Sequence, residues 1–478
     1  MNHVREYDLV VIGGGSGGYA AARTARDLGA SVAIADPGPL GGLCILRGCM
    51  PSKTLIATSD LMNEIREAGA LAVGSCEPKV DYRAMIERKR RVIKGFADYR
   101  IEGLETFELL PGAARFTGPR ELLVGETRVR AKSIVIATGS IVAPPVFPGL
   151  RETGYIDSDG ALDDERRPDS LIVLGGGYVA VELGQFFSRV GVATTFLIRS
   201  PHLLSQTDAD VGNALTGYLR DEGIRIVAEA LVQRVERVGA RKRVVYKKDG
   251  KERFVEAEEI FYALGRVPKL DGLNLEAAGI EFHPVTGISV DLTMRTSNPY
   301  VYAIGDVVGR YPLVHVAIQE GEVAARNAVC EKDDVVDYRL SRAHTIFSDP
   351  QVAVAGESEK ELVAAGRRYL KATYPFDDHG KAIAIGKTKG FVKMLADPEG
   401  GRILGVQILG PEASDLIHEA IAAMYFGATV FDFVRIPHLH PTLAEILTYP
   451  AEDLVVQIEG ARMASERGDL PIAASVPG

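Results

Sequence analysis

Two of the four cysteines in this chain lie five residues apart, in a segment whose residue types favour redox chemistry of thiols. The segment reads Gly41-Gly42-Leu43-Cys44-Ile45-Leu46-Arg47-Gly48-Cys49-Met50-Pro51-Ser52-Lys53. Pro51 suits the first turn of a helix, and the apolar residues that follow it recur at helical spacing. A cysteine at a helix N-terminus lies at the positive end of the helix dipole, which favours the reactive thiolate. Cys44 and Cys49 are therefore predicted to cycle between a dithiol and a disulfide.

The size and composition of the chain restrict the classes of protein to which it can belong. Its 478 residues predict about three domains. The net charge of −9 argues against nucleic acid or an anionic membrane surface as the main partner. No apolar run reaches bilayer length, no signal-peptide pattern precedes the first strand, and the few cysteines do not form a secreted disulfide framework. We expect a cytoplasmic protein whose disulfide is catalytic.

The elements that must position the thiols begin with a glycine-rich repeat. The first copy spans 7–18 and the second spans 171–180, and both contain an apolar strand, a glycine-rich turn and the start of a helix. A second apolar strand follows each helix, at 31–35 and at 194–198. In such a βαβ unit the glycines permit a tight turn and place the helix N-terminus against a pyrophosphate. Two copies in the correct order predict two dinucleotide-binding folds.

The two repeats differ at the position that contacts an adenosine ribose. The first copy has Asp36 there, and a carboxylate binds ribose hydroxyls. The second copy has Ile198 at the same position, followed by Arg199, and Ala180 replaces its third glycine. Because an acid repels a 2′-phosphate whereas an arginine attracts one, the second repeat is predicted to prefer NADPH over NADH. The alternative is that Arg199 is an ordinary surface charge.

Further strands complete an α/β pattern. Strands at 134–139 and 260–265 each end in glycine and are expected to close the nucleotide-binding domains. A strand at 302–307 carries Asp306, an acid placed to meet a polar ligand. From about residue 341 the pattern changes to β-rich segments mixed with helices, without a glycine fingerprint. The predicted fold class is α/β, with two Rossmann-like nucleotide-binding domains and a C-terminal α+β domain.

These features together resemble the FAD-dependent pyridine nucleotide–disulfide oxidoreductases of class I, over residues 6–460. The resemblance rests on both glycine fingerprints, the Cys44-x4-Cys49 spacing, Ala303-Ile304-Gly305-Asp306 and His440-Pro441-Thr442-Leu443-Ala444-Glu445. Within the family, the segment from Gly48 to Lys53 is most similar to the dihydrolipoamide dehydrogenase branch and the related mercuric-reductase-like branch.

The resemblance implies a division of the chain into four consecutive parts. These are the first part of an FAD-binding domain at 1–148, an NAD(P)-binding domain at 149–270, the second part of the FAD or central domain at 271–340, and a dimerisation domain at 341–478. A mobile C-terminal tail is expected from about Gly460.

The resemblance also implies which residues bind the cofactors. FAD would contact Gly13, Gly15, Ser16, Gly17, Gly18, Asp36, Thr138, Gly139 and Asp306. NADPH or NADH would contact Gly175, Gly177, Tyr178, Val179, Glu182 and Arg199. The predicted cofactor site is completed by Gly42, Lys53 and Gly265. Tyr178 matches a position that covers the empty nicotinamide pocket, and a packing role for this tyrosine is the alternative.

Two catalytic thiols and one ion pair carry over from the family. Cys49 would be the thiol against the flavin, and Cys44 would be the interchange thiol that forms the mixed disulfide with the substrate. Lys53 and Glu182 match an ion pair near the flavin–nicotinamide contact. The remaining cysteines are predicted to be free thiols: Cys76 and Cys330.

A histidine near the C-terminus would move the protons. Thiol–disulfide exchange requires a proton to leave one thiol and reach another, an imidazole can carry it, and Glu445 would orient the ring of His440. His438 is the alternative base. In the family this histidine reaches the cysteines of the other subunit, so we expect a homodimer with its active sites at the subunit interface.

The predicted reaction transfers two electrons between NAD(P)H, FAD, a Cys44–Cys49 disulfide and a small disulfide or dithiol, with dihydrolipoamide as the leading substrate. The catalytic alternatives are a glutathione-reductase-like or a mercuric-reductase-like enzyme. A lipoyl-carrying protein is a further expected partner, and a docking subunit of a larger complex is the non-catalytic alternative. A zinc site made of both cysteines with His438 and His440 would leave both nucleotide folds unexplained, so no metal is predicted.

The redox segment departs from the family's commonest form. Leu43 replaces a threonine, and Arg47 places a cation between the cysteines, where we expect it to alter a thiol pKa or the choice of substrate. Arg23 matches a glutathione-binding arginine, but Glu322 stands where the second would be, which counts against glutathione. The absence of a C-terminal cysteine pair counts against mercuric reductase.

Overall fold

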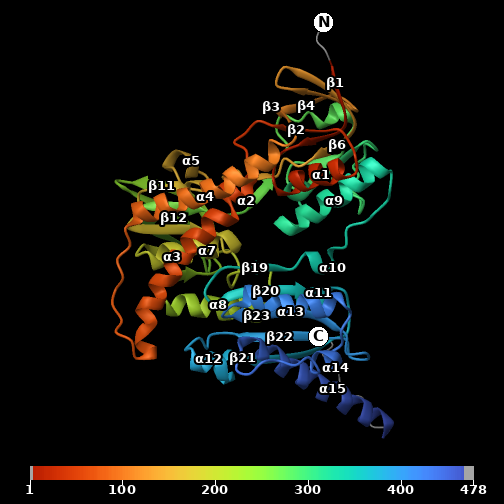
Figure 1. Ribbon diagram of the computed structural model, residues 1–478. Helices are drawn as coiled ribbons and strands as arrows, with labels where there is room; N and C mark the ends of the chain where they lie inside the picture. The colour runs from red at the N-terminus through yellow and green to blue at the C-terminus, as the bar shows by residue number, and fades with distance from the viewer. Residues whose placement is uncertain (1–3, 468–478) are drawn as a thin grey trace.

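The computed structural model describes residues 4–467, which form three sheet-centred regions along the long dimension of the molecule (Figure 1). The strands nearest the N-terminus lie at one end, and the strands from residue 344 onward lie at the other. The second glycine-rich repeat belongs to the region between them. The predicted α/β class is confirmed. None of the helices within the described range is both long and apolar enough to cross a bilayer.

A seven-stranded sheet forms the first region, in the order β3-β2-β1-β6-β5-β4 with β18 paired to β6. Its strands are β1 (Arg5–Ile12), β2 (Val32–Asp36), β3 (Glu108–Pro111), β4 (Ala114–Gly118), β5 (Glu121–Val124), β6 (Thr127–Ile136) and β18 (Val301–Ala303). The strands β3, β2, β1, β6 and β18 run parallel. Alternate residues of β1 enter different core clusters, so both faces of the sheet are buried, as parallel sheets require.

Two helices cover one face of this sheet and pack closely against each other. They are α1 (Ser16–Asp27) and α9 (Val314–Cys330). A Cβ on Gly17 would lie 2.8 Å from the carbonyl oxygen of Ala317, and one on Gly321 would collide with the carbonyl oxygen of Gly17. Glycine at these positions therefore lets the two helix backbones approach each other and fixes α1 beneath the first glycine-rich turn.

The second region repeats the nucleotide-binding pattern with a parallel sheet in the order β10-β9-β8-β14. Its elements are β8 (Ser170–Leu174), α7 (Tyr178–Arg189), β9 (Ala193–Leu197), α8 (Ala209–Asp221), β10 (Arg225–Val227) and β14 (Glu259–Tyr262). The strands predicted after each glycine-rich helix are observed as β2 and β9, each shifted by a single residue.

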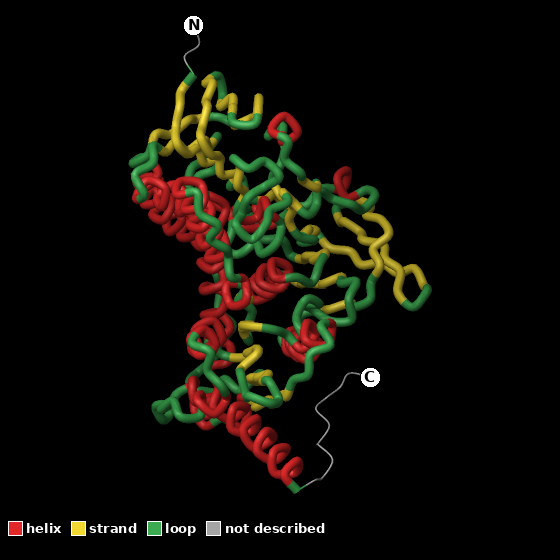
Figure 2. Tube along the Cα trace, turned by 90° about the vertical axis from the view of Figure 1, so that its right-hand side faces the viewer, coloured by secondary structure: helices red, strands yellow, loops and turns green. Residues whose placement is uncertain are grey.

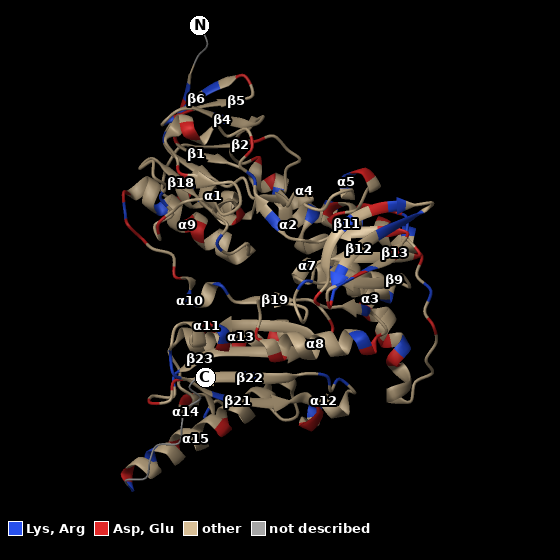
Figure 3. Cartoon of the chain, turned by 180° about the vertical axis from the view of Figure 1, so that it is seen from behind, with Lys and Arg blue, Asp and Glu red and all other residues tan. Residues whose placement is uncertain are grey.

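An antiparallel sheet is inserted into the second region, and a short strand pair joins the first two regions. The inserted sheet contains β11 (Leu231–Val238), β12 (Arg241–Lys248) and β13 (Lys251–Ala257), and the pair is β7 (Ser140–Val142) with β15 (Arg266–Pro268). Figure 3 shows basic and acidic residues interspersed along the inserted sheet. Within this sheet Arg234 forms an ion pair with Glu252 at 3.1 Å. Such pairs neutralise part of the charge on the exposed surface of the sheet.

The third region is built on an antiparallel sheet in the order β19-β20-β23-β22-β21. Its strands are β19 (His344–Ile346), β20 (Gln351–Gly356), β21 (Leu370–Pro375), β22 (Phe391–Ala396) and β23 (Ile403–Gly410). The longer helices that pack on it are α13 (Ala413–Tyr425) and α15 (Thr448–Glu466), and α15 ends away from the body of the molecule (Figure 2).

The expected tail from Gly460 is wrong in its starting point. The helix α15 continues to Glu466, with Ile458 and Ala464 buried along it, and Ile458 belongs to the hydrophobic core of the third region. The remainder of the expected tail lies outside the described residues.

Three helices carry the thiol segment and its support. They are α2 (Gly42–Arg47), α3 (Cys49–Glu67) and α4 (Tyr82–Leu104). Asp81 caps α4 by accepting a hydrogen bond from the backbone N–H of Ala84 at 3.0 Å. The remaining short elements are α5 (Leu150–Thr153), α6 (Ser158–Asp163), α10 (Tyr338–Ser341), α11 (Glu359–Ala364), α12 (Gly380–Ala384), α14 (Val430–Phe433), β16 (Phe282–His283), β17 (Gly287–Ile288), η1 (Ala68–Leu71), η2 (Leu275–Ala278), η3 (Gly305–Val308), η4 (Phe376–Asp378) and η5 (Leu443–Leu447).

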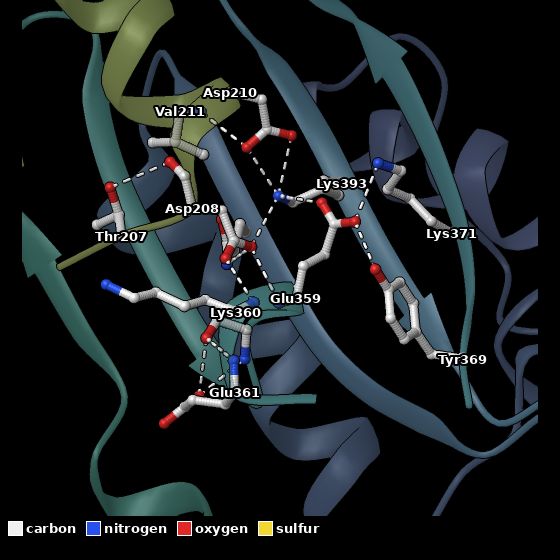
Figure 4. A network of polar contacts seen from close by, with 12 residues as sticks. Thr207, Asp208, Asp210, Val211, Glu359, Lys360, Glu361, Tyr369, Lys371 and Lys393 are labelled. Carbon is white, nitrogen blue, oxygen red and sulfur yellow. Dashed lines mark hydrogen bonds and ion pairs between the residues drawn. The ribbon is translucent and has the colours of Figure 1, made fainter. Parts of the chain in front are cut away.

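A buried lysine joins the second region to the third (Figure 4). The fully buried ammonium of Lys393 lies 2.8 Å from carboxylate oxygens of Asp208 and Asp210 and 3.0 Å from Glu359. Gln407 donates a further hydrogen bond to Asp208 at 2.6 Å. The three carboxylates are close enough together to suit a metal ion, but the ammonium already occupies the position between them. The cluster therefore acts as a cross-link between α8 and the third sheet.

Replacing Lys393 with methionine is expected to destabilise the protein by about 3–5 kcal/mol, because buried carboxylates would lose their cation. Lys371 provides a matched control on the neighbouring strand, since its ion pair with Glu359 is partly exposed, and Lys371→Met should cost less than about 1 kcal/mol. Urea unfolding at a fixed protein concentration measures both effects. Equal losses for the two variants would show that the buried cluster is not the cross-link.

Candidate active site

The two predicted redox cysteines lie side by side at the junction of α2 and α3. Cys44 is within α2, Cys49 is the first residue of α3, and both are half-buried free thiols. A hydrogen bond from the Cys44 thiol and, to a smaller extent, the Lys53 ammonium together lower the pKa of Cys49 to about 7, against the opposing effect of burial. The same hydrogen bond, together with burial, raises the pKa of Cys44. Cys49 is therefore the thiolate of the pair, and Cys44 holds the proton.

An ion pair stands beside Cys49. Lys53 lies one helical turn beyond Cys49 on α3, and its ammonium is 2.7 Å from a carboxylate oxygen of Glu182 on α7. Phe347 of the third region contacts both partners: its backbone N–H donates to Glu182 at 3.0 Å, and its ring centroid lies 4.5 Å from the Lys53 nitrogen. The pair thus links the thiol helix, the second glycine-rich repeat and the third sheet. The sequence motifs did not point to Phe347, because it lies far along the chain from both Lys53 and Glu182.

One cavity of about 2160 Å³ contains both cysteines and both glycine-rich turns. Every predicted site residue except His440 and Glu445 lines it. These residues are Gly13, Gly15, Ser16, Gly17, Gly18, Asp36, Gly42, Cys44, Cys49, Lys53, Thr138, Gly139, Gly175, Gly177, Tyr178, Val179, Glu182, Arg199, Gly265 and Asp306.

The first glycine-rich turn forms a cradle that excludes side chains. A Cβ on Gly13 would collide with the carbonyl oxygen of Ala137, and one on Gly18 would collide with that of Gly13. Gly42 packs against Gly15 so closely that its Cβ would lie 2.7 Å from the Gly15 Cα. Within the described part of the chain no side chain caps the N-terminus of α1, so its backbone N–H groups remain available to a pyrophosphate. The residues present fit the adenosine diphosphate part of FAD.

Asp36 is the last residue of β2, and backbone hydrogen bonds fix the position of its carboxylate. Its two carboxylate oxygens accept hydrogen bonds from the backbone N–H groups of Gly14 and Gly38, each at 2.7 Å. Elsewhere on the wall of the same cavity, Asp306 accepts a hydrogen bond from the hydroxyl of Ser140 at 2.6 Å. Ser140 directly follows the Thr138-Gly139 motif, so extending that motif by one residue would have found it.

The second glycine-rich turn has the same geometry but a different chemistry. Gly176 lies against Ile198 as Gly14 lies against Asp36, since a Cβ on either glycine would contact the side chain opposite it, at 2.9 and 3.2 Å. Ile198 therefore occupies the position that Asp36 has in the first repeat, and its side chain is fully buried. Arg199 is exposed on the cavity wall and has no ion-pair partner among residues 4–467. The second cradle thus offers a free cation where the first offers a carboxylate.

His440 and Glu445 form a pair outside the cavity. The His440 Nδ1 lies 3.0 Å from a Glu445 oxygen, and the imidazole is 81% exposed. The backbone N–H of Thr442, followed by the His440 ring, holds the pKa of Glu445 below its usual range. Because a carboxylate only accepts hydrogen bonds, Nδ1 carries the proton and Nε2 is left as the acid–base atom. Within one chain the structure does not bring this imidazole to the cysteines.

The alternative base, His438, is held in a different setting. Its Nε2 lies 2.7 Å from a carboxylate oxygen of Glu419, its Nδ1 lies 2.8 Å from the carbonyl oxygen of Ile436, and its side chain is only 8% exposed. The Nδ1 is hydrogen-bonded and the Nε2 is enclosed beside Glu419, so His438 is the poorer candidate for proton transfer to an external thiol.

The expectation that Arg47 alters a thiol pKa is wrong, whereas its effect on the choice of substrate stays a prediction. Its guanidinium turns toward α6, where it lies 3.4 Å from a carboxylate oxygen of Asp159. The cation that lowers the pKa of Cys49 is Lys53 instead. Arg23 is likewise paired, because Glu322 lies 3.5 Å from it.

Two dinucleotide cradles that share a cavity with a thiol pair define a nucleotide-dependent thiol–disulfide oxidoreductase. Residues 7–321 match the family model described as pyridine nucleotide-disulphide oxidoreductase, and residues 342–451 match the dimerisation domain of the same family. The chain belongs to the pyridine nucleotide–disulphide oxidoreductase family, whose members bind FAD and NAD(P)H.

Several relatives are similar to this chain over most of its length. The dihydrolipoyl dehydrogenase of Geobacillus stearothermophilus is 35% identical over 455 residues, which cover 94% of this chain and 96% of that protein. A mercuric reductase of Bacillus cereus is 32% identical over 446 residues, which cover 93% of this chain and 70% of that protein. The solved structure of the HOCl-induced flavoprotein disulfide reductase RclA from Escherichia coli matches with a TM-score of 0.83 and 25% identity, covering 93% of this chain and 99% of that one.

Proposed function

We propose that this chain transfers two electrons between a nicotinamide nucleotide and a small disulfide or dithiol, with dihydrolipoamide as the substrate. The observation that carries the proposal is the cavity that joins both glycine cradles to Cys44 and Cys49. FAD, when bound in the first cradle, would supply two-electron exchange between the nicotinamide and the thiols. The similarity to dihydrolipoyl dehydrogenase over nearly the full length of both proteins supports this substrate. The neutralisation of Arg23 by Glu322 disfavours the anionic glutathione.

The thiol chemistry follows from the unequal pKa values of the two cysteines. In the direction of disulfide reduction, His440 takes the proton of Cys44, whose sulfur attacks the substrate disulfide and forms a mixed disulfide. The first leaving thiolate takes that proton back from His440. The Cys49 thiolate then attacks the Cys44 sulfur, closes the Cys44–Cys49 disulfide and releases the second product thiolate. Two electrons pass to the substrate, and the nucleotide must return two electrons to the pair.

The position of His440 implies that a second copy of the chain completes the site. Its imidazole points to solvent in a single chain, yet the Cys44 proton needs a base. Large apolar side chains are exposed in the same region of the dimerisation domain, namely Phe426 at 84% and Leu439 at 77%. Such exposed apolar surface is typical of a subunit interface. We infer a homodimer in which the His440 of each subunit serves the cysteines of the other.

The geometry of the second cradle supports NADPH as the preferred nucleotide. Ile198 replaces the carboxylate that would repel a 2′-phosphate, and Arg199, which has no ion-pair partner among the described residues, lies beside it on the cavity wall. Arg199→Ala is expected to raise the KM for NADPH about ten-fold or more by removing a charge-assisted hydrogen bond. The KM for NADH, measured on the same variant, serves as the internal control and should change little. Equal changes for both nucleotides would contradict this role of Arg199.

Steady-state turnover of the FAD-loaded enzyme with NADPH tests the substrate. Lipoamide is expected to give a kcat/KM at least about ten-fold above that of glutathione disulfide or Hg(II). A higher value for either competitor would overturn the choice of dihydrolipoamide but not the reaction class. Binding of a lipoyl-carrying protein without turnover of either free lipoamide or the carrier-bound lipoyl group would favour the non-catalytic docking alternative.

A further inference from the structure

A tyrosine and a histidine from different regions are in contact on the wall of the cavity. Tyr178 is the first residue of α7 and directly follows the second glycine-rich turn, whereas His344 begins β19 in the dimerisation domain. Their rings are stacked, with centroids 5.4 Å apart and an interplanar angle of 27°. The tyrosine oxygen lies 3.3 Å from the His344 Nε2. Both residues line the cavity.

The backbone sets the direction of this hydrogen bond. The His344 Nδ1 lies 3.2 Å from the carbonyl oxygen of Arg342, and a carbonyl oxygen only accepts. Nδ1 therefore carries the proton, which leaves Nε2 as an acceptor for the Tyr178 hydroxyl in the neutral ring. Burial lowers the pKa of His344 and favours that neutral form. The carbonyl oxygen of Arg342 thus orients the His344 ring so that its Nε2 accepts the hydrogen bond from the Tyr178 hydroxyl.

The same segment of the dimerisation domain reaches the catalytic ion pair. Tyr178 and Glu182 are one turn apart on α7 and share a face of the helix. His344 contacts Tyr178, and Phe347 contacts both Glu182 and Lys53. The segment 344–347 therefore lies along the face of α7 that the nicotinamide would pass on its way from the glycine-rich turn to the ion pair.

We propose that His344 is a positioning residue that holds Tyr178 across the nicotinamide subsite, so that entry of the nucleotide requires this contact to break. The inference rests on the proposed function, because it assumes that the second cradle binds the nicotinamide nucleotide. If only a fraction of the molecules is open, the apparent dissociation constant for the nucleotide is the intrinsic constant divided by that fraction. His344 thus sets the apparent affinity for the nucleotide without contacting the reacting atoms.

Variants of the two residues separate the hydrogen bond from the stacking. Tyr178→Phe and His344→Phe each keep two stacked rings and remove the hydrogen bond, and each is expected to lower the dissociation constant of NADP+ by about three- to ten-fold. The double variant should gain little beyond either single variant, because both remove the same contact. His344→Ala also removes the stacking and should lower the constant further. In each variant the KM for NADPH should fall by a larger factor than kcat changes.

The readout is titration of the FAD-loaded enzyme with NADP+, together with steady-state KM and kcat. Fully additive effects of Tyr178→Phe and His344→Phe, or an unchanged or raised dissociation constant in His344→Ala, would overturn the inference while leaving the proposed function intact. Tyr178→Phe loses one hydroxyl only, so it keeps the test decisive if a His344 variant folds poorly. A wild-type enzyme that neither binds nor oxidises NADPH or NADH would overturn both the inference and the proposed function.

Discussion

Cys44→Ser and Cys49→Ser are each expected to lower NADPH-dependent disulfide reduction by about 10⁴-fold or more, because removal of a nucleophile that works as part of a unit abolishes the whole reaction. In the proposed reaction, Cys44 forms the bond with the substrate, and Cys49 breaks it. Neither hydroxyl can replace a sulfur in disulfide exchange. Steady-state oxidation of NADPH with lipoamide measures the loss.

The other cysteines supply the matched controls. Cys76 and Cys330 are exposed free thiols, and neither lines the cavity, so Cys76→Ser and Cys330→Ser should retain wild-type turnover. Substantial turnover in Cys44→Ser would contradict its role as the thiol that attacks the substrate. A comparable loss in Cys330→Ser would show that thiol substitution acts through folding rather than through chemistry.

His440→Ala is expected to lower disulfide turnover by about 10²- to 10⁴-fold at neutral pH, the range that general acid–base catalysis contributes. The reason is the raised pKa of Cys44, which keeps that thiol protonated without a base. Oxidation of NADPH by an artificial acceptor such as ferricyanide needs no proton transfer at Cys44, so it should fall much less. An equal fall in both reactions would indicate a structural role for His440.

Mixed dimers test whether the histidine acts across the interface. In a dimer of one Cys44→Ser chain and one His440→Ala chain, one active site contains an intact cysteine pair and the partner subunit's His440. Random reassortment of equal amounts should restore about a quarter of wild-type turnover, although each parent is nearly inactive. No recovery in mixtures shown to contain mixed dimers would place the acid–base residue in the same chain as the cysteines it serves.

The fold and the cavity were largely predictable because short segments specify them. In each glycine-rich repeat the spacing of the glycines reflects collisions that a Cβ would cause, such as that between Gly18 and the carbonyl oxygen of Gly13. The alternation of strands and helices then orders the two parallel sheets. Asp36 and Ile198 could be recognised as equivalent positions from the sequence, because each lies the same number of residues after the last position of its glycine fingerprint.

The contacts that the sequence did not predict join segments far apart in the chain. Arg47 was expected to act on the thiols, but α6 places Asp159 within its reach. Phe347 and His344 contact α7 only because the dimerisation domain docks against the second region, partly through Lys393. No local spacing encodes such docking. In the proposed reaction His440 acts on the cysteines of a second copy of the chain. Its sequence motif therefore indicated a role but not a position.

The most direct test of the central claim is an anaerobic titration of the FAD-loaded enzyme with NADPH, observed at long wavelength. The wild-type protein should develop the absorption band of a thiolate beside the flavin. The band should weaken as the pH falls below about 7, because a group whose pKa is lowered to that value is protonated there. Cys44→Ser should retain the band and Cys49→Ser should lack it. A band of wild-type intensity in Cys49→Ser would contradict the assignment of Cys49 as the thiolate that links the nucleotide cavity to the substrate.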